Sequence, residues 1–259
     1  MRCLIGMSGW SYKEWKGIFY PEKLPQKEFF SYYASQFSSV EVNTSFYYLP
    51  KASTIEKWYE TSPAAFTFTL KAPQAITHEA RLQHVQEDLA AFYQASDGLH
   101  EKAGAHLFQL PPSFRCNAQT YGILKTFILS LPREKDNVIE FRHASWENEE
   151  TINLLREHNV AMCQVSGRQV NEKLIKTGDF VYCRLHGEKY ATRYPEEDIE
   201  TLASLLADSA VQRAWAFQTP GSWLLSCDDP RLLRYCAICR MIRLMRRMPS
   251  SSSASEACA

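Results

Sequence analysis

The chain has 259 residues, of which 45% are hydrophobic and 13% aromatic, with 29 basic and 29 acidic side chains. A chain of this length and composition can bury a large core, which excludes a fibrous or wholly disordered protein. The formal net charge of zero argues against a protein that binds nucleic acid over its whole surface, although a local basic patch is compatible with it.

No window of the sequence approaches the roughly 18 uninterrupted apolar residues that cross a membrane. The N-terminus reaches Gly6, Ser8 and Gly9 before the apolar core of a secretory signal could form. The 8 cysteines are scattered, several of them in apolar runs where a small buried thiol is the ordinary interpretation. We therefore expect a cytoplasmic protein with reduced cysteines and no membrane contact.

Short apolar runs, which predict β-strands, alternate with longer segments of helical periodicity. We predict strands at residues 2–8, 38–43, 66–72, 105–112, 137–143, 160–165, 179–187 and 214–219. The helical patterns between and after them cover residues 26–37, 53–62, 87–100, 118–131, 148–159, 195–209 and 229–247. Ser53, with Glu56 three residues later, predicts a capping box at the start of the second helix.

A strand followed by a helix, repeated about eight times in roughly 250 residues, is typical of a (β/α)8 barrel. A doubly wound open sheet is the alternative, but the turn after the first strand lacks the Gly-x-Gly-x-x-Gly spacing. We predict one α/β domain, a single TIM-type barrel over residues 1–248, with a short or irregular link between the sixth and seventh strands. Residues 249–259 form a low-complexity tail that we expect to be disordered. Cys236 and Cys239 have the spacing of a redox motif, but no strand directly precedes them, which favours plain packing.

Polar side chains fall in the C-terminal half of nearly every predicted strand. Alternate residues of a strand share a face, so these side chains oppose the apolar face of each strand. They are Glu41, Asn43, Lys71, Gln109, Glu140, Arg142, Arg184 and His186. A barrel enzyme builds its active site at the C-terminal ends of the strands. We therefore predict that these residues meet at one mouth of the barrel.

Ion pairs that only neutralise one another are the structural alternative. Glu140 with Lys71, or Glu41 with Arg184, could form such pairs. Pairing of this kind seldom gains stability over a packed apolar layer, because desolvation offsets the Coulomb attraction. So many charged groups inside a barrel favour a ligand site over structural pairing.

Two predicted loops lie beside this mouth. The first contains Trp10 and Tyr12 among several aromatic residues, which are expected either to form a wall of the site or to pack over the barrel. The loop after the third strand contains Thr77 and His78. A single histidine in a loop has no definite role on sequence grounds.

Six stretches resemble the YecE-like family, also called domain of unknown function seventy-two. They are GMSGWSYKEWKGIFYPEKLP, FSSVEVNTSFYYLP, FTFTLKAPQAITHEARL, LFQLPPSF, VIEFRHASW and FVYCRLHGEKYATRYP. The resemblance implies a TIM-type barrel and gives positions, but it implies no reaction. Members of the family tend to have Phe-Asn-Asn at the end of the last strand, where this chain has Phe217, Gln218 and Thr219. A ligand contact made by those asparagines would be changed here.

The residue types favour an uncharacterised barrel protein that binds a small anionic or polyhydroxylated metabolite at the C-terminal face of the barrel. They do not decide whether it is an enzyme; if it is one, a hydrolase or an isomerase fits them best. Arg142, Arg184 and Lys71 would hold a phosphate or carboxylate. Either Glu41 or Glu140 would act as general base, and His186 as general acid or electrophile. The amides of Asn43 and Gln109 would orient hydroxyl groups, and Trp10, Tyr12 and His78 would complete the binding site.

Three alternatives stay open on sequence grounds. Lys71 could form a Schiff base, as in a lyase, because nearby cations would lower the pKa of its amine. The protein could be a non-catalytic module that binds a metabolite or nucleic acid, although the neutral charge disfavours nucleic acid. Glu41, Glu140, His186 and His78 could hold a divalent metal, but the nearby cations oppose it and no spaced ligand motif occurs. We expect no metal or other cofactor.

Overall fold

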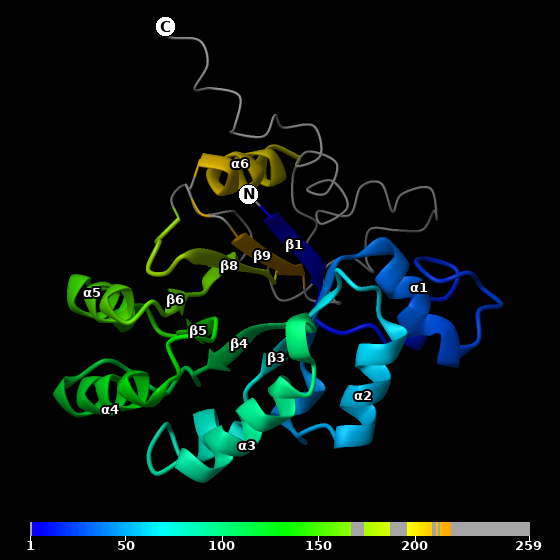
Figure 1. The fold of residues 1–259 in the computed structure, drawn as a ribbon. Coiled ribbons are helices and arrows are strands. Elements are labelled where there is room, and N and C mark those ends of the chain that lie inside the picture. Colours follow the sequence, from blue (N-terminus) through cyan, green and yellow to red (C-terminus); the bar gives the residue numbers. More distant parts are fainter. Residues whose placement is uncertain (1, 167–173, 187–195, 209–210, 212, 219–259) are drawn as a thin grey trace, which may run out of the picture.

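The protein folds into a parallel β-barrel surrounded by helices, as the computed structural model shows (Figure 1). The structure describes residues 2–166, 174–186, 196–208, 211 and 213–218. The strands are β1 (Arg2–Met7), β2 (Ser39–Val42), β3 (Thr67–Lys71), β4 (Ala103–Gln109), β5 (Asn137–Glu140), β6 (Ala161–Met162), β7 (Gln164–Ser166), β8 (Phe180–Leu185) and β9 (Arg213–Gln218). Their order in the sheet is β6-β5-β4-β3-β2-β1-β9-β8-β7, and every described strand pair is parallel.

The sheet closes through β6 and β7, which are consecutive pieces of one extended segment interrupted at Cys163. β6 pairs with β5 on one side, and β7 pairs with β8 on the other. The interruption has a local cause, because the Thr177 hydroxyl accepts a hydrogen bond from the Met162 backbone nitrogen at 2.7 Å. These pieces together count as one barrel strand, so the prediction of a TIM-type barrel with eight strands is confirmed.

Helices lie around the outside of the barrel (Figure 1). They are α1 (Phe29–Gln36), α2 (Ala52–Thr61), α3 (Gln86–Asp97), α4 (Ala118–Ser130), α5 (Glu149–Glu157) and α6 (Glu196–Asp208). The predicted helix at 229–247, Cys236, Cys239 and the tail at 249–259 lie outside the described residues.

The capping box predicted at Ser53 is wrong. Lys51 has the extended backbone of an N-cap residue and α2 begins at Ala52, so Ser53 already lies inside the first turn, where its hydroxyl cannot cap the helix. A capping box does form at α4, where the Asn117 side chain accepts from the Thr120 backbone nitrogen and the Thr120 hydroxyl accepts from the backbone nitrogen of Asn117.

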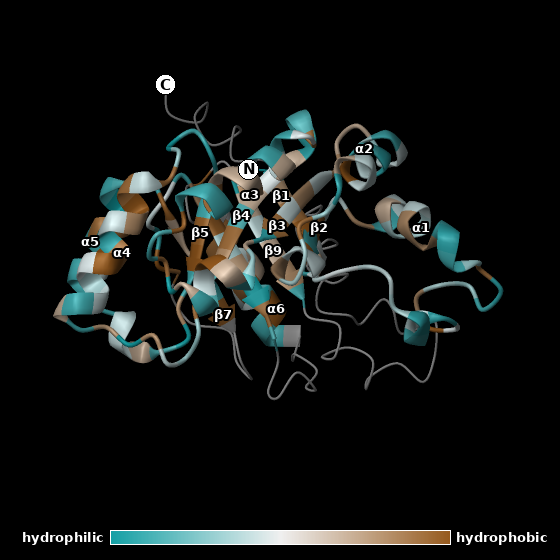
Figure 2. Cartoon of the chain, turned by 90° about the horizontal axis from the view of Figure 1, so that it is seen from below, coloured by the Kyte–Doolittle hydropathy of each residue, from teal (hydrophilic) through white to brown (hydrophobic). Residues whose placement is uncertain are grey.

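Alternation along the strands separates two apolar clusters, and many residues of the central strands are hydrophobic (Figure 2). The larger cluster joins outward-facing strand residues such as Val40 and Phe108 to the helices. The smaller one fills the barrel interior with Leu4, Ala105, Leu107, Val138, Ala161, Cys163, Phe180, Tyr182, Trp215 and Phe217. Each strand is parallel to its neighbours, so the inward positions that follow these residues all lie at the C-terminal mouth.

Candidate functional site

Arg184 occupies the centre of the barrel mouth. It lies near the end of β8 and is 2% exposed. Its Nη2 donates to Glu41 Oε1 at 2.7 Å, and its Nη1 donates to Glu140 Oε2 at 2.6 Å. The same Nη1 donates to Gln109 Oε1 at 3.1 Å. One guanidinium therefore joins β2, β4 and β5 to β8. We call Glu41, Arg184 and Glu140 the central ion triad.

Both carboxylates of the triad are ionised. Burial alone would raise the pKa of Glu41, but the Arg184 cation and hydrogen bonds from Ser8 Oγ (2.6 Å) and the Tyr182 hydroxyl (2.7 Å) bring that pKa below its ordinary value. Burial likewise opposes ionisation of Glu140, and the Arg184 cation outweighs it, so the pKa of Glu140 is also lowered. The central ion triad is buried and its charges are paired, so it forms the bottom, or floor, of the barrel mouth.

Arg142 and His186 lie beside Glu140. Arg142 Nε forms an ion pair with Glu140 Oε1, and its Nη2 donates to His186 Nε2 at 3.1 Å and approaches Gln109 Oε1 at 3.4 Å. A guanidinium can only donate, so Nε2 of His186 is an acceptor and the imidazole is neutral. Burial lowers the pKa of His186, which agrees with a neutral ring. The Arg142 side chain is 22% exposed, so this cation, unlike Arg184, is open to a ligand.

Lys71, at the end of β3, is the other partly exposed cation of the mouth. Its Nζ lies 4.1 Å from the ring centroid of Phe46. Burial, together with the repulsion of Arg184 and Arg142, lowers the pKa of Lys71 to about 8, although Glu41 and Glu140 act in the opposite direction. Nearly all of this lysine is still charged at neutral pH, with a neutral fraction of about a tenth at pH 7.

Of the two ion pairs considered from the sequence, one is present and one is not. Glu41 does pair with Arg184. Glu140 pairs with Arg184 and Arg142, and no ion pair with Lys71 occurs in the described part of the chain.

His78 and Asn43 complete the accessible edge of the mouth. His78 lies in the short helical turn Ala75–Glu79 after β3, with its ring 4.9 Å from that of Phe46 and its Nδ1 2.9 Å from Thr77 Oγ1. Burial and then the Lys71 cation lower the pKa of His78. Asn43 follows β2, and its buried Oδ1 has no hydrogen-bond partner among the residues that the structure describes.

The first loop places its two predicted residues differently. The Trp10 ring packs against Phe30 of α1 (5.1 Å between centroids) and Trp58 of α2 (5.4 Å), so it belongs to the helix layer. Tyr12 stays near the triad, because its hydroxyl donates to the Ser8 carbonyl at 2.7 Å. Burial and the nearby negative charge of Glu41 together raise the pKa of Tyr12 to about 12.

Sequence reasoning missed three contributors: Ser8, Tyr182 and Phe46. Ser8 and Tyr182 occupy inward positions by the same alternation that identified Arg184, but a hydroxyl does not stand out in an apolar strand as a charge does. Phe46 follows β2 in a turn of three residues, Thr44–Phe46, which no periodic pattern predicts. Gln164 of β7 makes hydrogen bonds with the backbone of Met162 and Ile175 rather than with the site.

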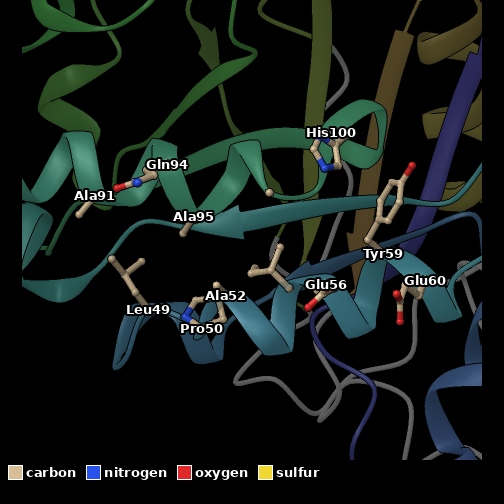
Figure 3. Close-up of a pocket in the computed structure, with 12 residues that line it drawn as sticks. Leu49, Pro50, Ala52, Glu56, Tyr59, Glu60, Ala91, Gln94, Ala95 and His100 are labelled. Atoms are coloured by element: carbon tan, nitrogen blue, oxygen red, sulfur yellow. The ribbon is translucent and has the colours of Figure 1, made fainter.

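A hollow of about 700 Å³ lies outside the barrel, between α2 and α3 (Figure 3). Its lining includes Leu49, Ile55, Ala91 and Ala95. None of the polar residues predicted from the strand ends lines it, so the candidate site remains the barrel mouth. Within residues 2–218, as far as they are described, no cluster of three or more His, Cys, Asp or Glu side chains could hold a metal ion. None of the described helices is long and apolar enough to cross a membrane.

Comparison with known proteins agrees with this architecture. The sequence pattern of the family described as "protein of unknown function DUF72" matches residues 4–221. The chain belongs to the DUF72 family. This DUF72 protein is 33% identical to the UPF0759 protein YecE of Escherichia coli K12 over 155 residues, which is 58% of this chain and 53% of YecE. It is 31% identical to the UPF0759 protein YunF of Bacillus subtilis over 148 residues, or 55% of this chain and 51% of YunF. The aligned region thus spans about half the length of these relatives.

Solved structures of two DUF72 proteins share the fold. The one from Thermotoga maritima superposes with a TM-score of 0.78 at 26% identity and covers 96% of this chain and 99% of its own. One from Enterococcus faecalis has a TM-score of 0.76 at 16% identity, covering 96% and 97%, which shows the fold alone.

Proposed function

We propose that this DUF72 protein binds a small anionic metabolite at the C-terminal mouth of its barrel. The charge of the mouth carries the proposal. Among the described residues, three cations, Arg184, Arg142 and Lys71, face two carboxylates, Glu41 and Glu140, which is an excess of one positive charge. A partly enclosed mouth with excess positive charge favours an anion, because the low local dielectric strengthens the attraction.

The mouth has a buried layer, the central ion triad, and a partly exposed layer that contains Arg142 and Lys71, and we assign them different roles. Both terminal nitrogens of Arg184 already donate to carboxylates, so the triad holds the floor and fixes the strands. Contact with the ligand falls to the partly exposed Arg142 and Lys71, which sit on β5 and β3 sides of that floor. Arg142 uses Nε and Nη2 in its contacts with Glu140, His186 and Gln109, so Nη1 is the nitrogen that would donate a charge-assisted hydrogen bond to a carboxylate or phosphate.

Neutral groups beside these cations favour a ligand that also has hydroxyl or carbonyl oxygens. Gln109 and Asn43 are both partly exposed, and the buried Oδ1 of Asn43 lacks a partner in the described structure. A buried polar atom of this kind costs free energy unless something satisfies it. A ligand hydroxyl that donates to Asn43 would remove that cost.

In a hydrolase or isomerase reaction, the lowered pKa values would make Glu41 and Glu140 weak bases at neutral pH. The proposal therefore assigns the carboxylates to positioning Arg184 and Arg142. Proton transfer falls to the imidazoles of His78 and His186, whose pKa values are lowered by burial and which are neutral at pH 7.

A thermal-shift screen with organic acids and phosphorylated sugars tests this proposal. A ligand that binds only the folded protein at 100 times its Kd stabilises it by about 2.7 kcal/mol. We expect at least one anion to raise the melting temperature of the wild type and of Arg156→Gln, an exposed control on α5, but not of Arg142→Gln. A shift that survives unchanged in Arg142→Gln would refute binding at the mouth.

A further inference from the structure

Lys71 differs from the other two cations of the mouth in what surrounds its charge. Arg184 and Arg142 each contact a carboxylate. The Lys71 ammonium lies over the Phe46 ring, and no carboxylate is within ion-pairing distance in the part of the chain that the structure describes. Glu41 and Glu140, the carboxylates of the central ion triad, both pair with arginine and not with this lysine.

A second buried lysine shows what a structural lysine looks like in this protein. Lys102 is 5% exposed, and its Nζ donates to Tyr59 O at 2.5 Å, Ser62 O at 2.8 Å and Ser62 Oγ at 2.9 Å. All three protons of that ammonium are satisfied, as burial of a charge requires. Lys71 is partly exposed and makes no such set of hydrogen bonds to the residues that the structure describes, so its ammonium is not held in place as a structural lysine is.

The charged groups that act on Lys71 come from β2, β8 and the end of β5, and His78 comes from the turn after β3. Arg184 and Arg142 repel an ammonium, Glu41 and Glu140 attract it, and the His78 ring packs at nearly a right angle to the Phe46 ring, 4.9 Å between centroids. Repulsion and partial burial both lower the pKa of Lys71, so a larger fraction of its side chain is the neutral amine at physiological pH than for an ordinary lysine. Lysines in such surroundings are the ones that act as nucleophiles toward carbonyl carbon.

We propose that Lys71 forms a Schiff base with a small carbonyl compound that also has a carboxylate or phosphate group. This inference rests on the proposed function, because the anionic group would be held by Arg142 while the carbonyl carbon faces Lys71. It narrows the ligand from any small anion to an oxo acid or a phosphorylated aldehyde or ketone. It also makes Lys71 the catalytic residue of a lyase or related enzyme.

The step balances without any further reactant. The Nζ lone pair attacks the carbonyl carbon and forms a C–N bond, while the C=O π electrons move to oxygen, which takes a proton. Nζ releases a proton, and the carbinolamine then loses its oxygen as water after a second protonation, leaving a C=N bond. His78 contacts the same Phe46 ring as Lys71 and is the neutral base suited to carry these protons.

Reductive trapping on the full chain tests the inference. The protein is incubated with glyoxylate, pyruvate, glyceraldehyde 3-phosphate or dihydroxyacetone phosphate, reduced with borohydride, and mapped by peptide mass spectrometry. An amine of pKa near 8 has about 200 times more neutral form at pH 7 than an ordinary lysine. We expect at least tenfold more adduct at Lys71 than at exposed lysines for one of these compounds. The adduct should be lost in Lys71→Arg and kept in Lys57→Arg, an exposed control on α2.

Two further arms separate the possible failures. Acetone and propanal, which lack the anionic group, should give at least tenfold less adduct, and equal trapping would overturn the anionic substrate class. If an anion stabilises the wild type but none of the four carbonyl compounds marks Lys71, the Schiff base is refuted and the proposed function stands. If no anion stabilises the protein and none traps Lys71, both are refuted.

Discussion

Replacing Arg184 by methionine removes the central cation of the mouth and keeps a side chain of similar length. Two fully buried carboxylates lose their strongest partner. Glu140 still contacts Arg142, but Glu41 keeps only the neutral donors Ser8 and Tyr182. Breaking a buried ion pair by removing one partner costs about 3–5 kcal/mol. We therefore expect Arg184→Met to lower the free energy of unfolding by at least about 3 kcal/mol at pH 7.

The pH dependence gives this prediction its sharpest test. In the wild type the folded pKa values of both carboxylates lie below their unfolded values, so their contribution to stability is complete above the unfolded pKa and is lost as the pH falls. Without Arg184, burial dominates and the folded pKa of Glu41 rises above the unfolded value. That penalty grows as the pH rises, so the deficit of Arg184→Met should be smaller at pH 5 than at pH 7.

Urea unfolding at both pH values, followed by circular dichroism, measures the deficit. Arg184→Met/Glu41→Gln is the matched variant, because a neutral amide needs no cation and fits the same space. It should recover about 2 kcal/mol or more of the loss at pH 7. A deficit in Arg184→Met below about 1 kcal/mol, with the same pH dependence as the wild type, would refute the view that Arg184 neutralises the floor of the site.

Two other buried groups give independent predictions. Burial lowers the pKa of His106 to about 3. The contribution of the neutral His106 to the free energy of unfolding is therefore fully present above its unfolded pKa of about 6.5 and is lost as the pH falls below that value. From pH 7 to pH 5 the wild type should lose about 2 kcal/mol more than His106→Gln in urea unfolding, and parallel losses would contradict the assignment. Lys102→Met removes three hydrogen bonds at the C-terminal end of α2. We expect the free energy of unfolding to fall by about 2–3 kcal/mol and the amides at that end of α2 to exchange faster. The exposed control Lys57→Met should stay within about 0.5 kcal/mol of the wild type.

The convergence of the charged residues followed from the sequence because two simple rules fix it. Alternation places Glu41, Gln109, Glu140 and Arg184 on one face of their strands, and parallel pairing places the ends of those strands at one mouth. Neither rule depends on fine detail of packing. The same reasoning located all eight barrel strands.

What could not be predicted depends on contacts between segments distant in the sequence. An aromatic residue in a loop has no periodicity to orient it, so Trp10 was equally compatible with the site and with the helices on which it packs. The break at Cys163 depends on a hydroxyl from Thr177, 15 residues away from Met162, to which it bonds. The pairing of Glu140 with Arg142 rather than Lys71 depends on side-chain reach, which strand alternation does not encode.

The central cation also sets an order on assembly. Glu41 and Glu140 precede Arg184, the arginine that they share, by 143 and 44 residues. During synthesis both carboxylates are therefore made well before Arg184. Arg142 can pair with Glu140 as soon as β5 is made, but the arginine that pairs with Glu41 arrives only with β8, so Glu41 must stay hydrated in an unfinished barrel. Burial of the mouth therefore requires β8, and a chain that ends before β8 would leave the interior of the barrel hydrated.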